Sequence, residues 1–261
     1  PGEDLSSTVN KKTLSEVDAA SLRGSGVVVR ADLNVPLDGG RITDDQRIRA
    51  SLETLRTLTD AGARVVLLSH LGRPKGEPAP EYSLAPVAEH LNDLLDAPVV
   101  FVPHTRGEAV EAAVAGLADG SIALLENTRF EAGETANAPD LAAFWASLGS
   151  LFVNDAFGAA HRAHASTTGL AEATTARGGE AVAGHLLARE LRFLEEALRM
   201  PERPFVAIIG GAKISTKIDV ISALLPRVDR LLIGGAMADT FFRALGLGTG
   251  ASRVEAQSVG A

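Results

Sequence analysis

Short polar or basic sequences, most of them with arginine or histidine, follow four short apolar segments of this 261-residue sequence. These segments have the composition of buried strands, and they cover Val27–Arg30, Val65–Leu68, Ile122–Leu125 and Leu151–Val153. Because ligands bind outside the carboxyl ends of the strands in an open α/β sheet, we expect the basic residues to meet at one edge. The planar guanidinium group of arginine matches the oxygens of a phosphate or a carboxylate two at a time. The pattern therefore predicts a site for a small, highly anionic molecule.

The residues that follow these segments support an anion site. Asp32 and Asn34 precede Pro36, in a position where short polar side chains commonly build a turn without any ligand. They share the predicted edge with four residues from other segments: His70, Arg73, Arg129 and Arg162. A single arginine is more often a surface residue than a ligand contact, but several at corresponding strand ends favour a common ligand. His161 and His164 have no obvious further ligands, so we predict no metal site.

The composition excludes several classes of protein. A net charge of −8 argues against a nucleic-acid-binding protein, which would present a basic face. No apolar run approaches the roughly 20 residues that span a bilayer, and no secretory leader is visible. With no cysteine, the chain has neither disulfides nor thiolate metal sites. We therefore expect a cytoplasmic protein with no nucleic acid or membrane partner, and the missing initial methionine suggests a processed or cut N-terminus.

Strand-like and helix-like segments alternate along most of the chain, as in a parallel sheet with crossover helices. Two sequences with capping-box spacing, Thr43–Gln46 and Thr105–Glu108, predict helix starts. Gly62 and Gly116 are the expected terminators of these two helices. Together with the strand at Val99–Val102, the pattern predicts one α/β domain with a doubly wound parallel sheet over residues 27–170. Further helices are expected at Ser83–Leu95 and Pro139–Leu148.

Residues 184–200 have the pattern of a longer amphipathic helix that ends at Pro201 and joins two domains. Its single apolar stripe is formed by Leu187, Leu191, Leu194 and Leu198. Beyond it, Phe205–Ile209 and Leu231–Ile233 have the pattern of strands in a second α/β unit. Because two strands make a poor independent sheet, we expect the sequence to be a fragment of a longer protein.

Glycine-rich segments follow both strands of the second unit. Gly210–Lys217 superficially resembles a phosphate-binding loop without its standard spacing, and its apolar pattern predicts a helix with Lys213 and Lys217 one turn apart. Two lysines at a helix N-terminus are unfavourable unless an anion lies between them, although a solvated pair is the alternative. Gly234–Gly235 permits either close approach to a ligand or tight packing. Gly246–Gly250 does not match the dinucleotide-binding pattern.

Seven segments together resemble the phosphoglycerate kinase family, and they occur in the family's order over almost the whole chain. Any one match would be weakly specific, whereas the set is highly specific. The segments are Val29–Pro36, Asp45–Ile48, Ser69–Pro74, Leu125–Phe130, Val153–Gly158, Ala160–His164 and Gly210–Lys213.

The resemblance implies two doubly wound, Rossmann-like domains facing a cleft. Residues 1–184 would bind phosphoglycerate, residues 185–201 would form the interdomain helix, and residues 202–261 would be part of a nucleotide-binding domain. The implied substrate-binding residues are Asp32, Asn34, Arg47, His70, Leu71, Gly72, Arg73, Arg129 and Arg162. The implied nucleotide-binding residues are Gly211, Ala212, Lys213, Lys217, Gly234 and Gly235.

The implied activity is that of a monomeric glycolytic kinase, which transfers a phosphoryl group reversibly between 1,3-bisphosphoglycerate and ADP to give 3-phosphoglycerate and ATP. A carboxylate is already an anionic nucleophile at neutral pH, so the reaction needs positioning and charge compensation rather than a general base. Arg47 and Lys213 are the implied catalytic residues, and Mg²⁺ would enter bound to ATP or ADP. Asp239 stands where the family usually has asparagine, and the family's later nucleotide-binding segments would lie beyond Ala261.

Two other classes of protein are compatible with part of the pattern. A non-catalytic anion-binding module would hold a phosphorylated metabolite at the arginine-rich edge without chemistry, and a turnover assay separates it from a kinase. A nicotinamide-dependent enzyme on a Rossmann-type fold would need the glycine spacing that Gly246–Gly250 lacks. Calorimetry with NAD tests that class.

Overall fold

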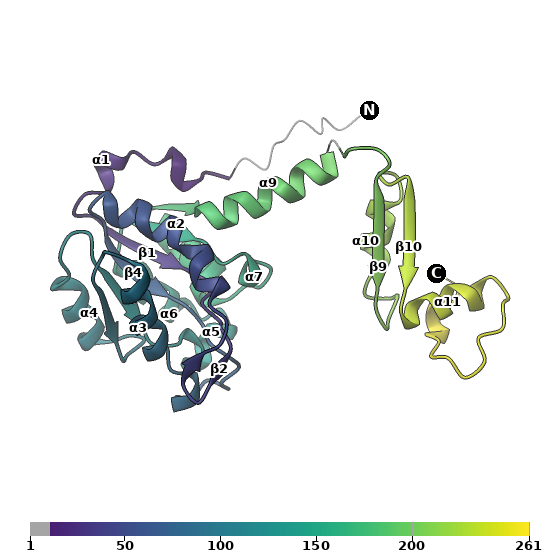
Figure 1. The fold of residues 1–261 in the computed structure, drawn as a ribbon, viewed down its shortest axis with the longest axis horizontal. Coiled ribbons are helices and arrows are strands. Elements are labelled where there is room, and N and C mark those ends of the chain that lie inside the picture. Colours follow the sequence, from purple (N-terminus) through teal and green to yellow (C-terminus); the bar gives the residue numbers. More distant parts are fainter. Residues whose placement is uncertain (1–10, 200, 261) are drawn as a thin grey trace. The chain divides into compact units, whose positions relative to one another are not determined.

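A computed structural model describes residues 11–199 and 201–260 of the chain. The chain divides into two compact units, Pro1–Arg192 and Phe193–Ala261, and Figure 1 shows the elements of each. Residues 1–10, which are mostly polar and have no regular apolar pattern in the sequence, lie outside the described residues. Within the described parts of the chain, no helix is both long and apolar enough to cross a bilayer.

The first unit is built around a parallel sheet of six strands in the order β5-β6-β4-β1-β7-β8. This arrangement confirms the predicted α/β class. The sequence does not predict β8, because its four residues include two alanines and show no clear strand pattern. The strands are β1 (Gly26–Arg30), β4 (Arg64–Leu68), β5 (Val99–Val102), β6 (Ile122–Leu125), β7 (Leu151–Asn154) and β8 (Glu180–Ala183).

Helices cover both faces of this sheet because the side chains of each strand alternate between two apolar cores. Val27 and Val29 face a core shared with α1, α2 and α3, whereas Val28 faces a core shared with α4, α6 and α8. Trp145 is fully buried in the second core, and its indole N–H donates to the carbonyl of Thr105 at 2.8 Å. These helices are α1 (Ala19–Leu22), α2 (Gln46–Asp60), α3 (Ala85–Leu94), α4 (Glu108–Ala115), α6 (Pro139–Ser147) and α8 (Leu170–Ala176).

Short elements connect the main helices and strands of the first unit. A hairpin formed by β2 (Leu37–Asp38) and β3 (Arg41–Ile42) turns through two glycines with positive φ. The remaining elements in the described part of this unit are three short 3-10 helices, one π-helical turn and two short α-helices. The 3-10 helices are η1 (Leu14–Glu16), η2 (Pro80–Tyr82) and η3 (Thr128–Phe130), the π-helical turn is η4 (Ala165–Gly169), and the α-helices are α5 (Ala132–Thr135) and α7 (Phe157–Ala160).

Both predicted capping boxes are wrong, although both helices form. Helix α2 begins at Gln46, whose backbone N–H donates to Asp44 Oδ1 at 2.9 Å, so Thr43 lies outside the helix. Helix α4 begins after Gly107, and the Thr105 hydroxyl donates instead to the carboxylate of Glu131. In each case a partner close in space replaces the expected bond within the helix. The predicted ends are confirmed, because α2 and α4 stop just before Gly62 and Gly116.

Helix α9 (His185–Arg199) begins against the buried carboxylate of Asp155. Asp155 Oδ1 accepts from the backbone N–H groups of Leu186 at 2.9 Å and Leu187 at 3.2 Å. A Cβ on Gly184 would overlap this carboxylate, so the approach requires glycine. Burial raises the pKa of the Asp155 carboxyl, and Oδ2 is buried without a hydrogen-bond partner. This aspartate therefore caps α9 from within the sheet core.

The apolar stripe predicted along α9 is only partly buried. Leu187 is 8% exposed, whereas Leu194 is 49% exposed. The side chain of Leu198 lies outside the described residues. The start of the helix packs against the first unit, where His185 donates its backbone N–H to Thr54 Oγ1 of α2 at 2.9 Å.

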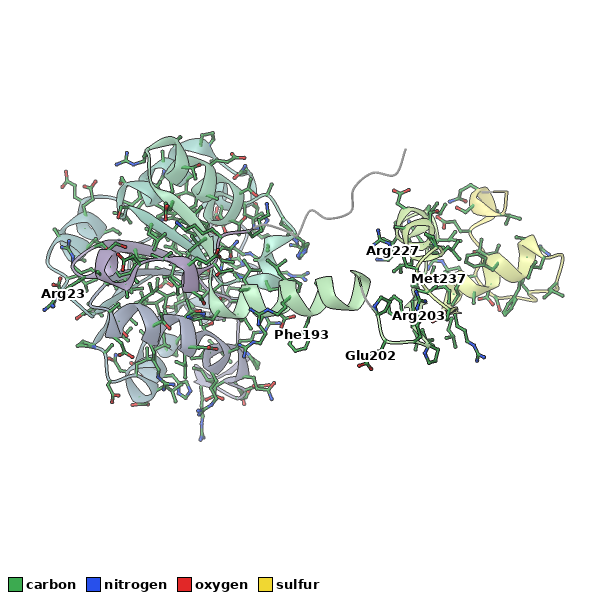
Figure 2. All side chains as sticks on the ribbon, turned by 90° about the horizontal axis from the view of Figure 1, so that it is seen from above. Arg23, Phe193, Glu202, Arg203, Arg227 and Met237 are labelled. Atoms are coloured by element: carbon green, nitrogen blue, oxygen red, sulfur yellow. The ribbon has the colours of Figure 1, made fainter. Side chains whose placement is uncertain are left out.

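The second unit contains two parallel strands, β9 (Val206–Gly210) and β10 (Arg230–Gly234), with α10 (Ile218–Leu224), α11 (Ala236–Ala244) and η5 (Ala256–Ser258). Its small core contains Ile214, Ile221 and the fully buried Met237, which Figure 2 labels. The helix predicted to carry Lys213 is wrong at its start, because α10 begins only after Lys217. The N–H of Lys217 donates to the Ile214 carbonyl at 2.7 Å, so a turn precedes the helix. Leu225, at the C-terminal end of α10, is 57% exposed.

We expect Asp155→Ala to lower the free energy of unfolding by about 1–2 kcal/mol, because Leu186 and Leu187 lose their shared acceptor. Asp155→Asn should be at least as stable as the wild type, since its amide oxygen keeps the acceptor and the cost of burying a charge disappears. Urea unfolding measures both variants. Asp96→Ala, at an exposed aspartate between α3 and β5, is the control. An equally large loss in Asp155→Asn would show that the charge, and not the acceptor, holds the helix start.

Candidate functional site

Four parallel strands of the first unit end side by side. Strands β1, β4, β6 and β7 end at Arg30, Leu68, Leu125 and Asn154, and the register pairs Arg30 with both Leu68 and Asn154. We call this side of the sheet the carboxyl edge. The segments that leave these four strands carry all the predicted substrate-binding residues except Arg47, which lies in the first turn of α2.

Asp32 and Arg47 form an ion pair at the carboxyl edge. Arg47 Nη1 lies 2.7 Å from Asp32 Oδ2, and the two side chains are 53% and 13% exposed. A Cβ on Gly158 would lie 2.7 Å from Asp32 Oδ2, so glycine at that position makes room for the carboxylate. The aspartate orients Arg47, whose guanidinium group stays half exposed and can also donate to a ligand.

Backbone and amide groups join three of the strand ends. Asn34 Oδ1 accepts from the N–H of Gly72 at 2.8 Å, and the carbonyl of Gly72 accepts from Arg129 Nη1 at 2.6 Å. Leu71 is buried, and its N–H and carbonyl bond the side chain of Asn127 at 3.2 and 2.8 Å. Gly72 has φ +60, and a Cβ there would overlap the ring of Tyr82. These contacts fix the loop after β4 beside Arg129.

Positive charge is concentrated around Arg129. Burial lowers the pKa of Arg129, and the nearby Arg162 and Arg73 lower it further against the opposing effect of Glu134 and Asp32. Arg129 Nε is buried without a hydrogen-bond partner, which is costly for a charged donor. Arg73 and Arg162 are both exposed. An anion bound at this point would relieve the repulsion.

His70 lies at the same edge but is only 6% exposed. Its Nδ1 is 3.0 Å from Nη2 of Arg30. Burial lowers the pKa of His70 to about 2, and the positive charges of Arg30, Arg129, Arg47 and His164 act in the same direction. The imidazole is therefore neutral at physiological pH.

The structure thus brings the predicted substrate-side residues to one edge, although their roles toward a ligand stay predictions. The sequence did not single out three buried residues behind this edge: Arg30, Glu134 and Ser166. Arg30 closes an otherwise apolar strand and could have been noticed as a charge next to buried positions. Nothing in the local sequence marks Glu134 or Ser166.

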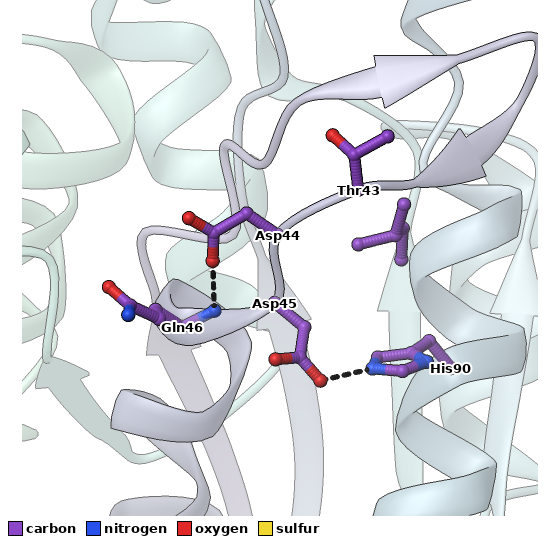
Figure 3. Close-up of a pocket in the computed structure, with 6 residues that line it drawn as sticks. Thr43, Asp44, Asp45, Gln46 and His90 are labelled. Carbon is purple, nitrogen blue, oxygen red and sulfur yellow. Dashed lines mark hydrogen bonds and ion pairs between the residues drawn. The ribbon is translucent and has the colours of Figure 1, made fainter.

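A hollow of about 400 Å³ beside the first turn of α2 is a poor candidate for anion binding (Figure 3). Asp44 and Asp45 line it, and two carboxylates repel an anion. Asp45 Oδ2 instead contacts His90 Nε2 at 2.8 Å, which ties α3 to the turn that carries Arg47. The lining residues are Ile42, Thr43, Asp44, Asp45, Gln46 and His90.

The predicted nucleotide-side residues lie together at the carboxyl ends of β9 and β10, within the second unit. Gly211, Ala212 and Lys213 are exposed in the loop after β9, Lys217 immediately precedes α10, and Gly234–Gly235 ends β10 and precedes α11. A Cβ on Gly235, which has φ +70, would lie 2.9 Å from the Gly211 carbonyl oxygen. Close packing of the two loops therefore accounts for Gly235 without a ligand.

No group of three or more His, Asp, Glu or Cys residues that could hold a metal ion occurs within residues 11–199 and 201–260. Mg²⁺ requires oxygen ligands. The exposed lysines and glycine backbone of the second unit suit phosphate oxygens rather than a metal. The described residues therefore do not fit a protein-held Mg²⁺ site.

Comparisons with known proteins agree on one family. The family model described as phosphoglycerate kinase matches residues 17–261. Phosphoglycerate kinases of Synechococcus elongatus and Herpetosiphon aurantiacus are 52% and 54% identical over 95% and 96% of this chain. The chain spans only 61% and 62% of their length. The solved phosphoglycerate kinase of Coxiella burnetii is 39% identical with a TM-score of 0.81, over 96% of this chain and 61% of the other.

We expect His70 to make the stability of the first unit depend on pH. Its folded-state pKa lies below the ordinary value, so the stability it confers is present above about pH 6.5 and is lost as the pH falls toward the folded pKa. Below about pH 6.5 the wild type should therefore lose roughly 1.4 kcal/mol per pH unit more than His70→Gln. Urea unfolding at several pH values measures this slope, with His104→Gln, at an exposed histidine, as control. Equal slopes in the wild type and His70→Gln would contradict a neutral His70.

Proposed function

Because the chain belongs to the phosphoglycerate kinase family, we propose that it takes part in reversible phosphoryl transfer between 1,3-bisphosphoglycerate and ADP, which gives 3-phosphoglycerate and ATP. The chain spans about 61% of the length of its curated relatives, so we assign the complete reaction to the family's full-length polypeptide. We assign phosphoglycerate binding to residues 1–184, the interdomain link to residues 185–201 and part of the nucleotide site to residues 202–261.

The observation that carries this proposal is the excess of unsatisfied positive charge at the carboxyl edge. Phosphoglycerate bears a phosphate and a carboxylate, and arginine forks bind both groups in bidentate geometry. We assign the phosphate to Arg73, Arg129 and Arg162, whose charges repel one another without an anion. Asn34, Leu71 and Gly72 hold the loops that present these arginines.

We assign Arg47 to the reacting end of the substrate. It is fixed on Asp32 yet half exposed, so it can contact the carboxylate and stabilise charge on the transferring phosphoryl group. Asp32 cannot attract phosphate, and we assign it to orienting Arg47 and accepting a hydrogen bond from the substrate hydroxyl. The nucleophile is the substrate's own carboxylate, so the protein contributes position and charge rather than a general base.

On the nucleotide side, we assign Lys213 and Lys217 to the phosphates, and the backbone of Gly211, Ala212 and Gly234–Gly235 to close approach of the nucleotide. Mg²⁺ supplies charge neutralisation when it is bound to ATP or ADP. We propose that it arrives with the nucleotide, because no metal cluster lies among the described residues.

The second candidate function is phosphoglycerate binding without turnover by the 261-residue chain. The geometry favours this alternative in one respect, since the carboxyl edge and the contacts that support it all lie within the first unit. A coupled assay for ATP formation distinguishes the two: binding without ATP formation supports the non-catalytic alternative, and sustained ATP formation supports the kinase.

We expect the purified chain to bind 3-phosphoglycerate in calorimetry, and Arg129→Ala to weaken binding by about tenfold or more, because a charge-assisted hydrogen bond is lost. Arg177→Ala removes the same charge from an exposed position before β8, at the opposite edge of the sheet, and should leave affinity unchanged. Equal affinities for the wild type and Arg129→Ala would contradict the assignment of this edge to phosphoglycerate.

In any preparation that forms ATP, Arg47→Ala should lower kcat by about 10³-fold, the size expected for an arginine that stabilises a phosphoryl-transfer transition state. Steady-state kinetics with saturating substrates measures this effect. A raised KM with an unchanged kcat would instead assign Arg47 to ground-state binding.

A further inference from the structure

Arg30 is a charged side chain with no access to a ligand. It is 1% exposed and lies at the end of β1, behind the carboxyl edge. Each of its three nitrogens has a partner: Nε donates to Ser166 Oγ at 2.8 Å, Nη1 donates to the Ala31 carbonyl, and Nη2 lies 3.0 Å from His70 Nδ1. Each nitrogen of Arg30 is therefore bonded to another group of the protein.

A buried carboxylate compensates this buried cation through Ser166. Glu134 is fully buried, and its Oε1 accepts from Ser166 Oγ at 2.6 Å while its Oε2 accepts from the Ser166 backbone N–H at 2.9 Å. The serine hydroxyl thus accepts from Arg30 and donates to Glu134. Thr128 Oγ1 also lies 3.3 Å from Glu134 Oε1, beside Arg129 in the chain. Burying a guanidinium group is tolerable only when such partners are present.

The contact between Arg30 and His70 determines where the imidazole carries its proton. A guanidinium group has donors and no acceptor, so Nδ1 of His70 must accept the hydrogen bond. A neutral imidazole that accepts at Nδ1 carries its single proton on Nε2.

Nε2 is the remaining polar atom of His70, and solvent reaches it. Among the described side chains, the buried polar atoms without a partner are Arg129 Nε, Asn137 Oδ1, Asp155 Oδ2 and Thr174 Oγ1. His70 Nε2 is not one of these four, and within the described residues no hydrogen bond to it occurs. It is therefore available as a donor at the carboxyl edge.

We propose that Arg30, held by Ser166 and Glu134, is a positioning residue that fixes His70 as a neutral imidazole with its proton on Nε2, so that His70 offers a bound phosphorylated ligand an uncharged hydrogen-bond donor. The identity of the ligand rests on the proposed function, whereas the tautomer does not. The titratable groups that act on His70 are Arg30 on β1, Arg47 on α2, Arg129 on η3 and His164 before η4, and a positive charge on any of them opposes a further one on His70. A neutral donor adds a ligand contact at this crowded edge without adding repulsion.

The tautomer is tested in the free, ¹⁵N-labelled protein by long-range ¹H–¹⁵N correlation spectra, with His70→Asn used to assign the ring signals. We expect Nδ1 to resonate as an unprotonated nitrogen and Nε2 as a protonated one, unchanged between about pH 5 and pH 8. A protonated Nδ1, or an imidazolium in this range, would overturn the proposal.

The role of Arg30 is tested by the double variant Arg30→Met with Glu134→Gln, which removes both charges so that no buried carboxylate is left unpaired. We expect His70 in this variant to populate both tautomers, in a protein whose circular dichroism is unchanged. An unchanged tautomer in the folded variant would remove Arg30 from its assigned role. If the variant does not fold, Ser166→Ala provides the same spectroscopic test with a smaller perturbation.

Calorimetry with 3-phosphoglycerate tests whether the N–H group at Nε2 of His70 donates a hydrogen bond to the ligand. His70→Gln keeps an uncharged N–H donor and should bind within a few-fold of the wild type, whereas His70→Ala should bind about tenfold more weakly. Equal losses in the two variants would overturn the neutral-donor role. Absence of binding by the wild type would contradict the proposed function, while the spectra would still decide the tautomer.

Discussion

Repulsion between positive charges at one edge of a parallel sheet is the constraint that governs the first unit. Arg73, Arg129 and Arg162 lie close enough to depress the pKa of Arg129, and that arginine also buries a donor without a partner. Two carboxylates offset part of this cost: Asp32 pairs directly with Arg47, and Glu134 lies fully buried behind the edge. The balance leaves uncompensated positive charge around Arg129, which an external anion would offset.

The parallel sheet makes such crowding possible because it brings four segments that are distant in the sequence to one place. Register pairs the last residues of β1, β4 and β7, so the loops that follow start at the same level. A slip of one residue would exchange the two core faces, and the apolar cores on both sides oppose it. Asn34, Gly72 and Arg129 then link the loops to one another. The position of each arginine therefore depends on the whole sheet.

The sequence predicts the strands well because buried parallel strands are continuous apolar runs, and the polar residues that follow them mark the carboxyl edge. It fails where a competing partner, near or distant in the sequence, decides the outcome. Thr105 bonds Glu131 rather than its own helix, and Asp44 takes the capping role expected of Thr43. Arg30 lies 136 positions from Ser166, so no local pattern reveals that its guanidinium group is buried and paired. The strand-end pattern and the family resemblance supplied the candidate residues, but only the fold shows how their donors are paired.

Two arginines in similar sequence positions differ in whether their hydrogen-bond donors have partners within the protein. Arg30 and Arg129 each occur at or just after the end of a buried strand, yet every nitrogen of Arg30 has a protein partner, whereas Nε of Arg129 has none among the described residues. The first can only position its neighbours, whereas Arg129 is only partly buried, so part of its side chain reaches the surface at the carboxyl edge. In the second unit, close packing against Gly211 already explains the glycine at position 235. Local geometry therefore gives weaker evidence for a ligand there. Geometry therefore supports an anion site on the first unit, while the identity of the anion and nucleotide binding by the second unit are proposals that rest on family membership.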